Sequence, residues 1–337
     1  VFGQSFTEFL GANIAGLPTI EIGPGAQVAA SDLRPEIQNE FESGADLTAF
    51  GGRAALEVSW YQKTISDLLV TGTLANSTGF GLRIFNGGQV RTRGAEAGLR
   101  LVPVTGDRVE WRSNTTFSTD RSRVLALTVP PFQPPGFGTT FGVFQVEAGR
   151  SLTQIVGNDS LPNGQGVVRQ VGDAIPDFRM GFNNTLRLGR IDVSSLVDWQ
   201  QGGEIINLTR YLWDLSRNGP DCNQVAAAPN PTNETVCARR IRTFARQTRN
   251  YIEDASFVKV REISLSYVVP SRLVKSLWSR ADAARVTLAG RNLFVFTDYT
   301  GLDPEVSNFG SQAVSRGFDV SPYPPSRAFW FSVDVGF

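Results

Sequence analysis

The feature that most constrains the fold is a run of alternating apolar and polar residues at residues 327–337, RAFWFSVDVGF. Apolar side chains occupy every second position: Phe329, Phe331, Val333, Val335 and Phe337. Period-two alternation over this length predicts a β-strand with one apolar face. In a membrane barrel such a strand would place Phe329, Phe331, Val333 and Val335 toward lipid and Asp334 toward the interior.

The same alternation recurs upstream, and we predict nine antiparallel strands between residue 39 and residue 337. Residues 1–38 show no sustained periodicity, so a loop with a partial strand is expected there. Behind Pro270, the segment SRLVKSLWSRAD has apolar residues at helical spacing. It predicts a short amphipathic helix at a membrane interface, with Ser271 as its N-cap.

Two turns set the strand registers. Gly189-Arg190 suits a type II′ turn, which pairs Leu188 with Ile191 and sets Arg187 opposite Asp192. Pairs further from the turn follow: Leu186 with Val193, and Phe182 with Val197.

The turn at Gly51-Gly52 sets Asp46 opposite Glu57. Like charges in that position are unfavourable, so either a cation lies between them or the register is shifted.

Connection lengths alternate along the chain. Those after the first, third, fifth and seventh strands have two to about 14 residues, and the others have about 20 to 55, including 64–87, 121–175 and 202–255. Short turns on one rim and long loops on the other are typical of an outer-membrane β-barrel. A soluble antiparallel sandwich is the alternative, but it does not explain the one-sided loop lengths.

Composition narrows the function. The chain has 32 basic and 32 acidic residues, which argues against nucleic-acid binding. The absence of histidine removes His-based catalysis and His-ligated metal sites, and no nucleophile stands beside a base, so we expect no enzyme, no metal and no cofactor. Cys222 and Cys237, 15 positions apart in a Pro/Asn-rich segment, are interpreted as a disulfide that closes a surface loop in an oxidising compartment.

The first residues, VFGQSFTEFL, lack an initiator Met and a signal-peptide pattern, so we expect a processed piece or a fragment.

Several segments resemble the C-terminal barrel of the SusC/RagA-type TonB-linked outer-membrane transporters. They include FNGGQVRTRGAEAGL (85–99), RNLFVFTDYTGLDPEV (291–306) and the closing YPPSRAFWFSVDVGF (323–337). The order and spacing agree from about residue 31 onward. No single motif is decisive, but Asn-Leu, Tyr-x-Gly-x-Asp-Pro-Glu and the terminal aromatic strand are together specific.

The resemblance implies an all-β, antiparallel transmembrane barrel of about 22 strands filled by an N-terminal plug. Residues 39–337 would supply its last nine strands, without the plug and the earlier strands.

The implied function is TonB-dependent import of an oligosaccharide or peptide across the outer membrane of a Gram-negative bacterium. The implied partners are a SusD-like surface lipoprotein, the TonB complex acting through the plug, and outer-membrane lipid. Phe337 would belong to the signal read by the outer-membrane assembly machinery. A passive porin or adhesin-like barrel remains the alternative, and an outer-membrane enzyme is the weakest reading.

The polar faces carry charges of both signs, which we interpret chiefly as structural ion pairs inside the lumen, with direct substrate contact as the other reading. Arg187 and Asp192 are predicted partners, and Arg100 and Glu110 are further members of this set.

Substrate contacts, whose residues the sequence does not identify, are more plausible in the long loops 132–146, 204–218 and 298–310. Within the last of these, Asp298, Asp303 and Glu305 could be a glycosidase pair or a Ca²⁺ site, but a turn stabilised by side-chain caps is favoured.

Overall fold

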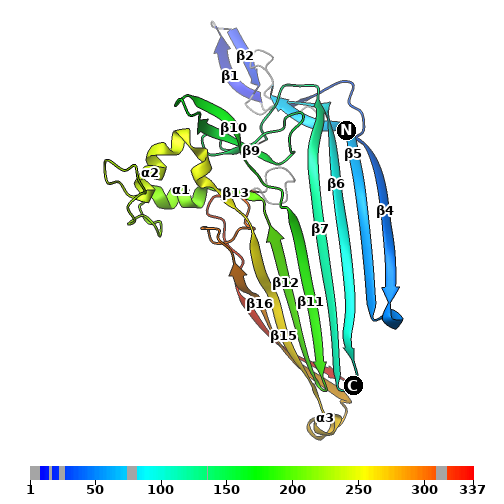
Figure 1. Ribbon diagram of the computed structural model, residues 1–337. Coiled ribbons are helices and arrows are strands. Elements are labelled where there is room, and N and C mark those ends of the chain that lie inside the picture. Colours follow the sequence, from blue (N-terminus) through cyan, green and yellow to red (C-terminus); the bar gives the residue numbers. More distant parts are fainter. Residues whose placement is uncertain (1–7, 15–16, 23–26, 74–81, 135, 309–316) are drawn as a thin grey trace.

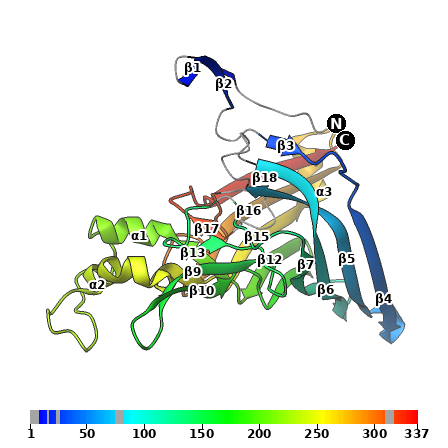
Figure 2. The same ribbon diagram turned by 90° about the horizontal axis from the view of Figure 1, so that it is seen from above.

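A computed structural model describes the chain except residues 1–7, 15–16, 23–26, 74–81, 135 and 309–316. One large antiparallel sheet dominates it, with the strand order β18-β16-β15-β12-β11-β7-β6-β5-β4 (Figures 1 and 2). These strands are β4 (Ile37–Ala49), β5 (Ala54–Thr73), β6 (Leu82–Thr105), β7 (Val109–Leu127), β11 (Phe178–Leu188), β12 (Ile191–Gln201), β15 (Phe257–Val269), β16 (Ala283–Phe296) and β18 (Ala328–Gly336). They are the nine strands expected from alternation.

Three short strands occupy the region expected to be mostly loop. β1 (Glu8–Ile14) and β2 (Leu17–Ile22) pair with each other, and β3 (Gln27–Ala29) runs parallel to the start of β6.

The sheet has one polar and one apolar face, and its apolar face is uncovered. Phe41, Phe329 and Phe331 on that face are 63%, 73% and 70% exposed. On the polar face, hydroxyls pair across strands, as between Ser194 and Ser264 at 2.6 Å. A soluble sandwich would bury the apolar face against a second sheet, so this arrangement excludes the sandwich alternative.

The predicted registers are confirmed. Leu188 pairs with Ile191 and Arg187 with Asp192, and Asp46 lies opposite Glu57. The first turn is longer than predicted, because residues 50–53 form it with a short 3₁₀ turn at Phe50–Gly52. The register is not shifted, and Arg100 of the neighbouring strand β6 lies 3.8 Å from Glu57. It compensates Glu57 from the side and does not lie between the two carboxylates as the first alternative required.

The loop predicted over 64–87 is wrong for residues 64–73 and 82–87, and its middle part, residues 74–81, lies outside the described residues. Strand β5 runs to Thr73 and strand β6 begins at Leu82, and these two residues pair with each other. Two irregularities, between Ile65 and Leu68 and between Leu68 and Leu69, shift the register. Because each shift interrupts the period of two, the sequence loses its strand pattern where the hydrogen-bonded ladder continues.

The two ends of the sheet differ as predicted, except that the connection between β5 and β6 is shorter than expected. Tight turns join β4 to β5, β6 to β7 and β11 to β12 at the lower end in Figure 1. The connections that follow β7, β12 and β16 leave from the upper end. The described parts of these upper connections fold together into what we call the cap, defined as residues 128–134, 136–177, 202–256, 297–308 and 317–327.

The cap contains regular structure where long loops were expected. Its elements are β8 (Val143–Phe144), β9 (Gln154–Ser160), β10 (Gly166–Asp173), β13 (Glu204–Asn207), α1 (Leu208–Leu215), α2 (Val236–Thr243), η3 (Phe244–Arg246), η4 (Thr248–Tyr251), β14 (Ile252–Asp254) and β17 (Phe318–Asp319). Its core includes Phe144, Ile155 and Ile206, each almost fully buried. The principal hydrophobic core of the described chain is therefore in the cap and not in the sheet.

The helix predicted after Pro270 is present as α3 (Ser271–Leu277), in the connection between β15 and β16. Ser271 is its first residue rather than its N-cap, because Pro270 holds the cap position. Val274 packs against Ala284 and, beside it, Val335 on the apolar face of the sheet. The helix therefore folds onto the outside of the wall. Among the described residues, no helix has the length and apolar character needed to cross a membrane.

Candidate functional site

The candidate site is a recess between the polar face of the wall and the cap, with a volume of about 540 Å³. Strands β7, β11 and β12 contribute Asp120, Arg179 and Gln200, and the cap contributes Glu204 and Glu305. A second recess of about 210 Å³ adjoins it and shares Arg179, Gln200 and Glu305. The two recesses form one hollow where the wall meets the cap, lined by both polar and apolar side chains.

Arg179 is the most available hydrogen-bond donor in this hollow. Its Nε donates to the Gln200 side chain at 3.0 Å. Within the described residues, its terminal nitrogens have no hydrogen-bond or ion-pair partner. They are therefore free to bind an oxygen-bearing solute.

A buried lysine closes the cap onto the wall. Lys259 of β15 is 3% exposed. Its ammonium group lies 2.6 Å from Asp303, contacts Glu305, and sits 4.7 Å from the centre of the Phe257 ring. Asp303 also accepts the backbone N–H of Glu305 at 2.8 Å, which is a side-chain cap. The structural reading of the carboxylates at 303 and 305 is therefore confirmed, and their partner is the wall.

A β-bulge at Arg261 makes this contact possible. Strict alternation would place Lys259 and Arg261 on the apolar face with Ile263. The register shifts at this point against both β12 and β16. Lys259 consequently pairs opposite Asp198 on the polar face, and Arg261 bonds Asp198 at 2.6 Å.

Further contacts tie the long connections to one another. The Tyr299 hydroxyl donates to Asp319 at 2.5 Å, and Thr209 donates to the same carboxylate. Arg210 of α1 lies 3.0 Å from Glu253, which accepts the backbone N–H of Thr300 at 2.9 Å. Burial and the bond to Asp319 raise the pKa of Tyr299, so its hydroxyl stays protonated as a donor.

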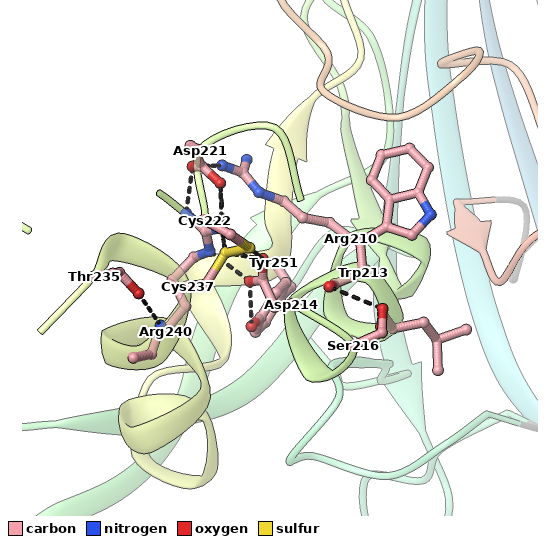
Figure 3. The surroundings of a disulfide bond; sticks show 12 residues. Arg210, Trp213, Asp214, Ser216, Asp221, Cys222, Thr235, Cys237, Arg240 and Tyr251 are labelled. Carbon is pink, nitrogen blue, oxygen red and sulfur yellow. Dashed lines mark hydrogen bonds and ion pairs between the residues drawn. A yellow bond between two sulfur atoms is a disulfide. The ribbon is translucent and has the colours of Figure 1, made fainter. Parts of the chain in front are cut away.

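A disulfide and a buried charge cluster hold the outer part of the cap (Figure 3). Cys222 and Cys237 are bonded, with Cα atoms 4.8 Å apart. Asp214 of α1 is fully buried and accepts two hydrogen bonds from Arg240 of α2, both at 2.6 Å. The Tyr251 hydroxyl donates to the same carboxylate at 2.8 Å. Together these contacts clamp the two helices.

The cluster resembles a metal site only by composition. The ligand atoms of Asp214, Asp221, Cys222 and Cys237 lie within 4.8 Å of one another. Both sulfurs are in the disulfide, and Arg240 bonds both carboxylates. The guanidinium of Arg240 therefore occupies the place where a metal ion would have to bind these carboxylates.

Acid is expected to loosen this cluster. Hydrogen bonds from Arg240 lower the pKa of Asp221 to about 2, although burial opposes the shift. The carboxyl of an aspartate in an unfolded chain has a pKa of about 3.9. The stabilisation of the fold by Asp221 is therefore complete above that pH and is lost as the pH falls toward 2. Pepsin should therefore cleave the connection between α1 and α2 increasingly from pH 4 to pH 2. Asp221→Asn should be more sensitive at pH 4 and show a weaker pH dependence, and equal profiles for the two proteins would contradict this assignment.

Some of the ion pairs predicted on the polar face are present in the structure, and others have different partners. Arg187 lies 3.4 Å from Asp192 and 3.3 Å from Glu110, and Arg285 approaches Asp192 at 3.7 Å. Arg100 contacts Glu57 rather than any of the other predicted members.

Two of the loops considered for substrate contacts use their aromatic side chains internally. Phe141 and Tyr211 contact Phe244, with ring centres 4.9 and 4.4 Å apart, and Phe144 is 1% exposed. These rings form the core of the cap, so they are not free to stack on a ligand.

Sequence reasoning missed Lys259, Arg261 and Asp198. A usable signal exists, because two cations stand in β15 at positions that alternation assigns to the apolar face. Such an arrangement is costly and points to a bulge.

A curved antiparallel wall with an uncovered apolar face, tight turns at one end and a folded cap at the other defines a partial wall of a large β-barrel. A family model described as "TonB dependent receptor-like, beta-barrel" matches residues 2–293. The chain belongs to this family.

Relatives and solved structures agree. TonB-dependent receptor P26 of Formosa agariphila is 26% identical over 91% of this chain, and TonB-dependent receptor SusC of Bacteroides thetaiotaomicron is 20% identical over 91%. The structure of the RagAB peptide transporter superposes with a TM-score of 0.73 over 99% of this chain, at 16% identity. The chain spans 35% of the P26 relative and 38% of the matched RagAB chain. It is thus SusC/RagA-like and covers about a third of the length of these relatives.

Proposed function

We propose that this chain is the C-terminal wall and external cap of an outer-membrane, TonB-dependent importer. The observation that carries the proposal is the hollow between wall and cap, which lies on the polar face of a wall whose other face is apolar and uncovered. Residues 39–337 supply the last strands of the barrel in this proposal. The earlier strands and the plug belong to the remainder of the longer protein.

The proposed substrate is an oligosaccharide or a peptide. The hollow offers a guanidinium at Arg179, an amide at Gln200 and carboxylates at Asp120 and Glu204. Such a mixed set hydrogen-bonds to hydroxyls and to peptide groups without requiring a charged ligand.

The proposed partners are a SusD-like surface lipoprotein over the cap and the TonB complex, acting through the plug. Support comes from the similarity to SusC and from the likeness to the RagAB peptide transporter. Outer-membrane lipid covers the apolar face. Phe337, which is 84% exposed just beyond β18, acts as part of the assembly signal. The lining ion pairs, including Arg187 with Asp192, serve as structural elements of the lumen wall.

A passive porin or adhesin-like barrel is the competing function. The cap argues against the porin, because its connections are bonded together and to the wall at Lys259. A barrel that only passes solutes does not need its external loops locked over the inner wall.

Uptake tests this proposal. The full-length transporter, with Arg179→Ala, should bind its substrate roughly tenfold more weakly, because a hydrogen bond to a charged group contributes about 1.5–3 kcal/mol. Arg100→Ala removes an arginine from the same polar face outside the hollow and should bind normally. Uptake of radiolabelled or fluorescent glycans and peptides is measured with and without the proton gradient. Growth on the same compounds is measured after deletion of the gene. Uptake that persists without energy, or unchanged growth on every candidate, would contradict import.

A further inference from the structure

Four arginines face one another on the apolar side of the wall. Arg91 of β6 lies opposite Arg123 of β7, and Arg93 lies opposite Arg121. They share this face with Ala95, two residues further along β6. Like charges directly opposite each other destabilise a sheet. Two such pairs side by side therefore require an explanation.

The chain neutralises only part of this charge. Arg121 forms an ion pair with Asp177 at 2.6 Å. Arg93 donates to the Gln62 amide oxygen at 2.7 Å, and Arg123 donates to a backbone carbonyl at 2.9 Å, so neither gains a negative partner. The Nε of Arg91 is buried without any hydrogen bond. Among the described residues, Asp177 is the one acid that pairs with any of the four.

The position of these arginines along the wall matches the external edge of the apolar band. Arg121 stands ten residues beyond Trp111 on β7, toward the cap. At about 3.3 Å per residue and a tilt of about 40°, this is roughly 25 Å along the barrel axis, the height of the apolar band in outer-membrane barrels. Trp60 and Phe117 face the same way just below the arginines, at the level expected for an aromatic girdle.

We propose that Arg91, Arg93, Arg121 and Arg123 bind phosphate groups of a lipid headgroup in the external leaflet of the membrane. A guanidinium binds phosphate through two parallel N–H···O bonds, and a phosphorylated headgroup at this height supplies the missing negative charge. The lipid then neutralises the facing arginine pairs, and the wall acquires a fixed lipid between its apolar band and its cap. This inference rests on the membrane placement proposed above.

Lipid binding by the purified full-length transporter in detergent tests the inference. The ligands are diphosphoryl lipid A, the same lipid without phosphates, and inorganic phosphate. The variant R91Q/R93Q/R123Q should bind diphosphoryl lipid A at least roughly tenfold more weakly, because charge-assisted hydrogen bonds are lost. The matched control R217Q/R272Q/R280Q removes three exposed arginines that lie off the sheet and should bind normally.

Gel mobility with and without heating shows whether each variant is a folded barrel. If the triple variant does not assemble, the single variant R93Q replaces it. Equal binding of the phosphorylated and dephosphorylated lipids would overturn the site, as would equal binding by the variant and the control. If inorganic phosphate displaces the lipid and binds as tightly as the lipid does, the site binds phosphate alone and the lipid assignment is wrong. Because no uptake is measured, failure of the import proposal and failure of this site are distinguishable.

Discussion

Replacing Lys259 by methionine is expected to release the 297–308 segment from the wall at a cost of about 3–5 kcal/mol, the usual effect of breaking a buried ion pair. Lys259 is the buried cation between Asp303 and Glu305, and Asp303 is itself 5% exposed. Methionine fills a similar volume but leaves Asp303 buried without its cation. The carboxylate must then move into water, and the connection moves with it.

Hydrogen–deuterium exchange of the full-length transporter measures this effect locally. Exchange should rise at residues 297–308 and remain unchanged in β11 and β12. Lys275→Met is the matched control, because Lys275 pairs with Asp282 where both side chains are mostly exposed, so it should change little. In Lys259→Met/Asp303→Asn the unpaired charge is also gone, and much of the protection should return. Normal protection in Lys259→Met alone would show that the lysine does not hold the cap.

The wall could be predicted from the sequence because its determinants are local. Each strand shows its own alternation, and a turn such as Gly189-Arg190 sets the register of both neighbouring strands by itself. The pairing of Arg187 with Asp192 therefore followed without knowledge of any distant residue.

The candidate site could not be predicted in the same way, because distant contacts create it. Lys259 meets Asp303 only because a bulge at Arg261 changes the side of the sheet on which the lysine lies. The cap elements likewise pair across long separations, as β13 does with β17. A connection rich in proline and glycine gives no local sign of such packing.

Asp214→Ala should have a comparable effect on the outer cap, with a loss of about 3–5 kcal/mol in local stability. The Asp214 side chain has no solvent exposure and accepts bonds from Arg240 and Tyr251. Without it, the guanidinium of Arg240 stays largely buried with only Asp221 as an anionic partner, and the Tyr251 hydroxyl loses its acceptor. Helices α1 and α2 should then separate within the limit set by the Cys222–Cys237 bond.

Exchange should accordingly rise over residues 208–216 and 236–251, and reduction of the disulfide should raise it further, since the bond restricts the opened state. Asp159→Ala is the control in the same cap, because its partner Arg169 has a side chain that is 56% exposed, so their ion pair should contribute about 1 kcal/mol. If Asp214→Ala and Asp159→Ala exchange alike, the buried cluster does not hold the helices together. If reduction alone has the full effect, the covalent bond rather than the charge cluster fixes the outer cap.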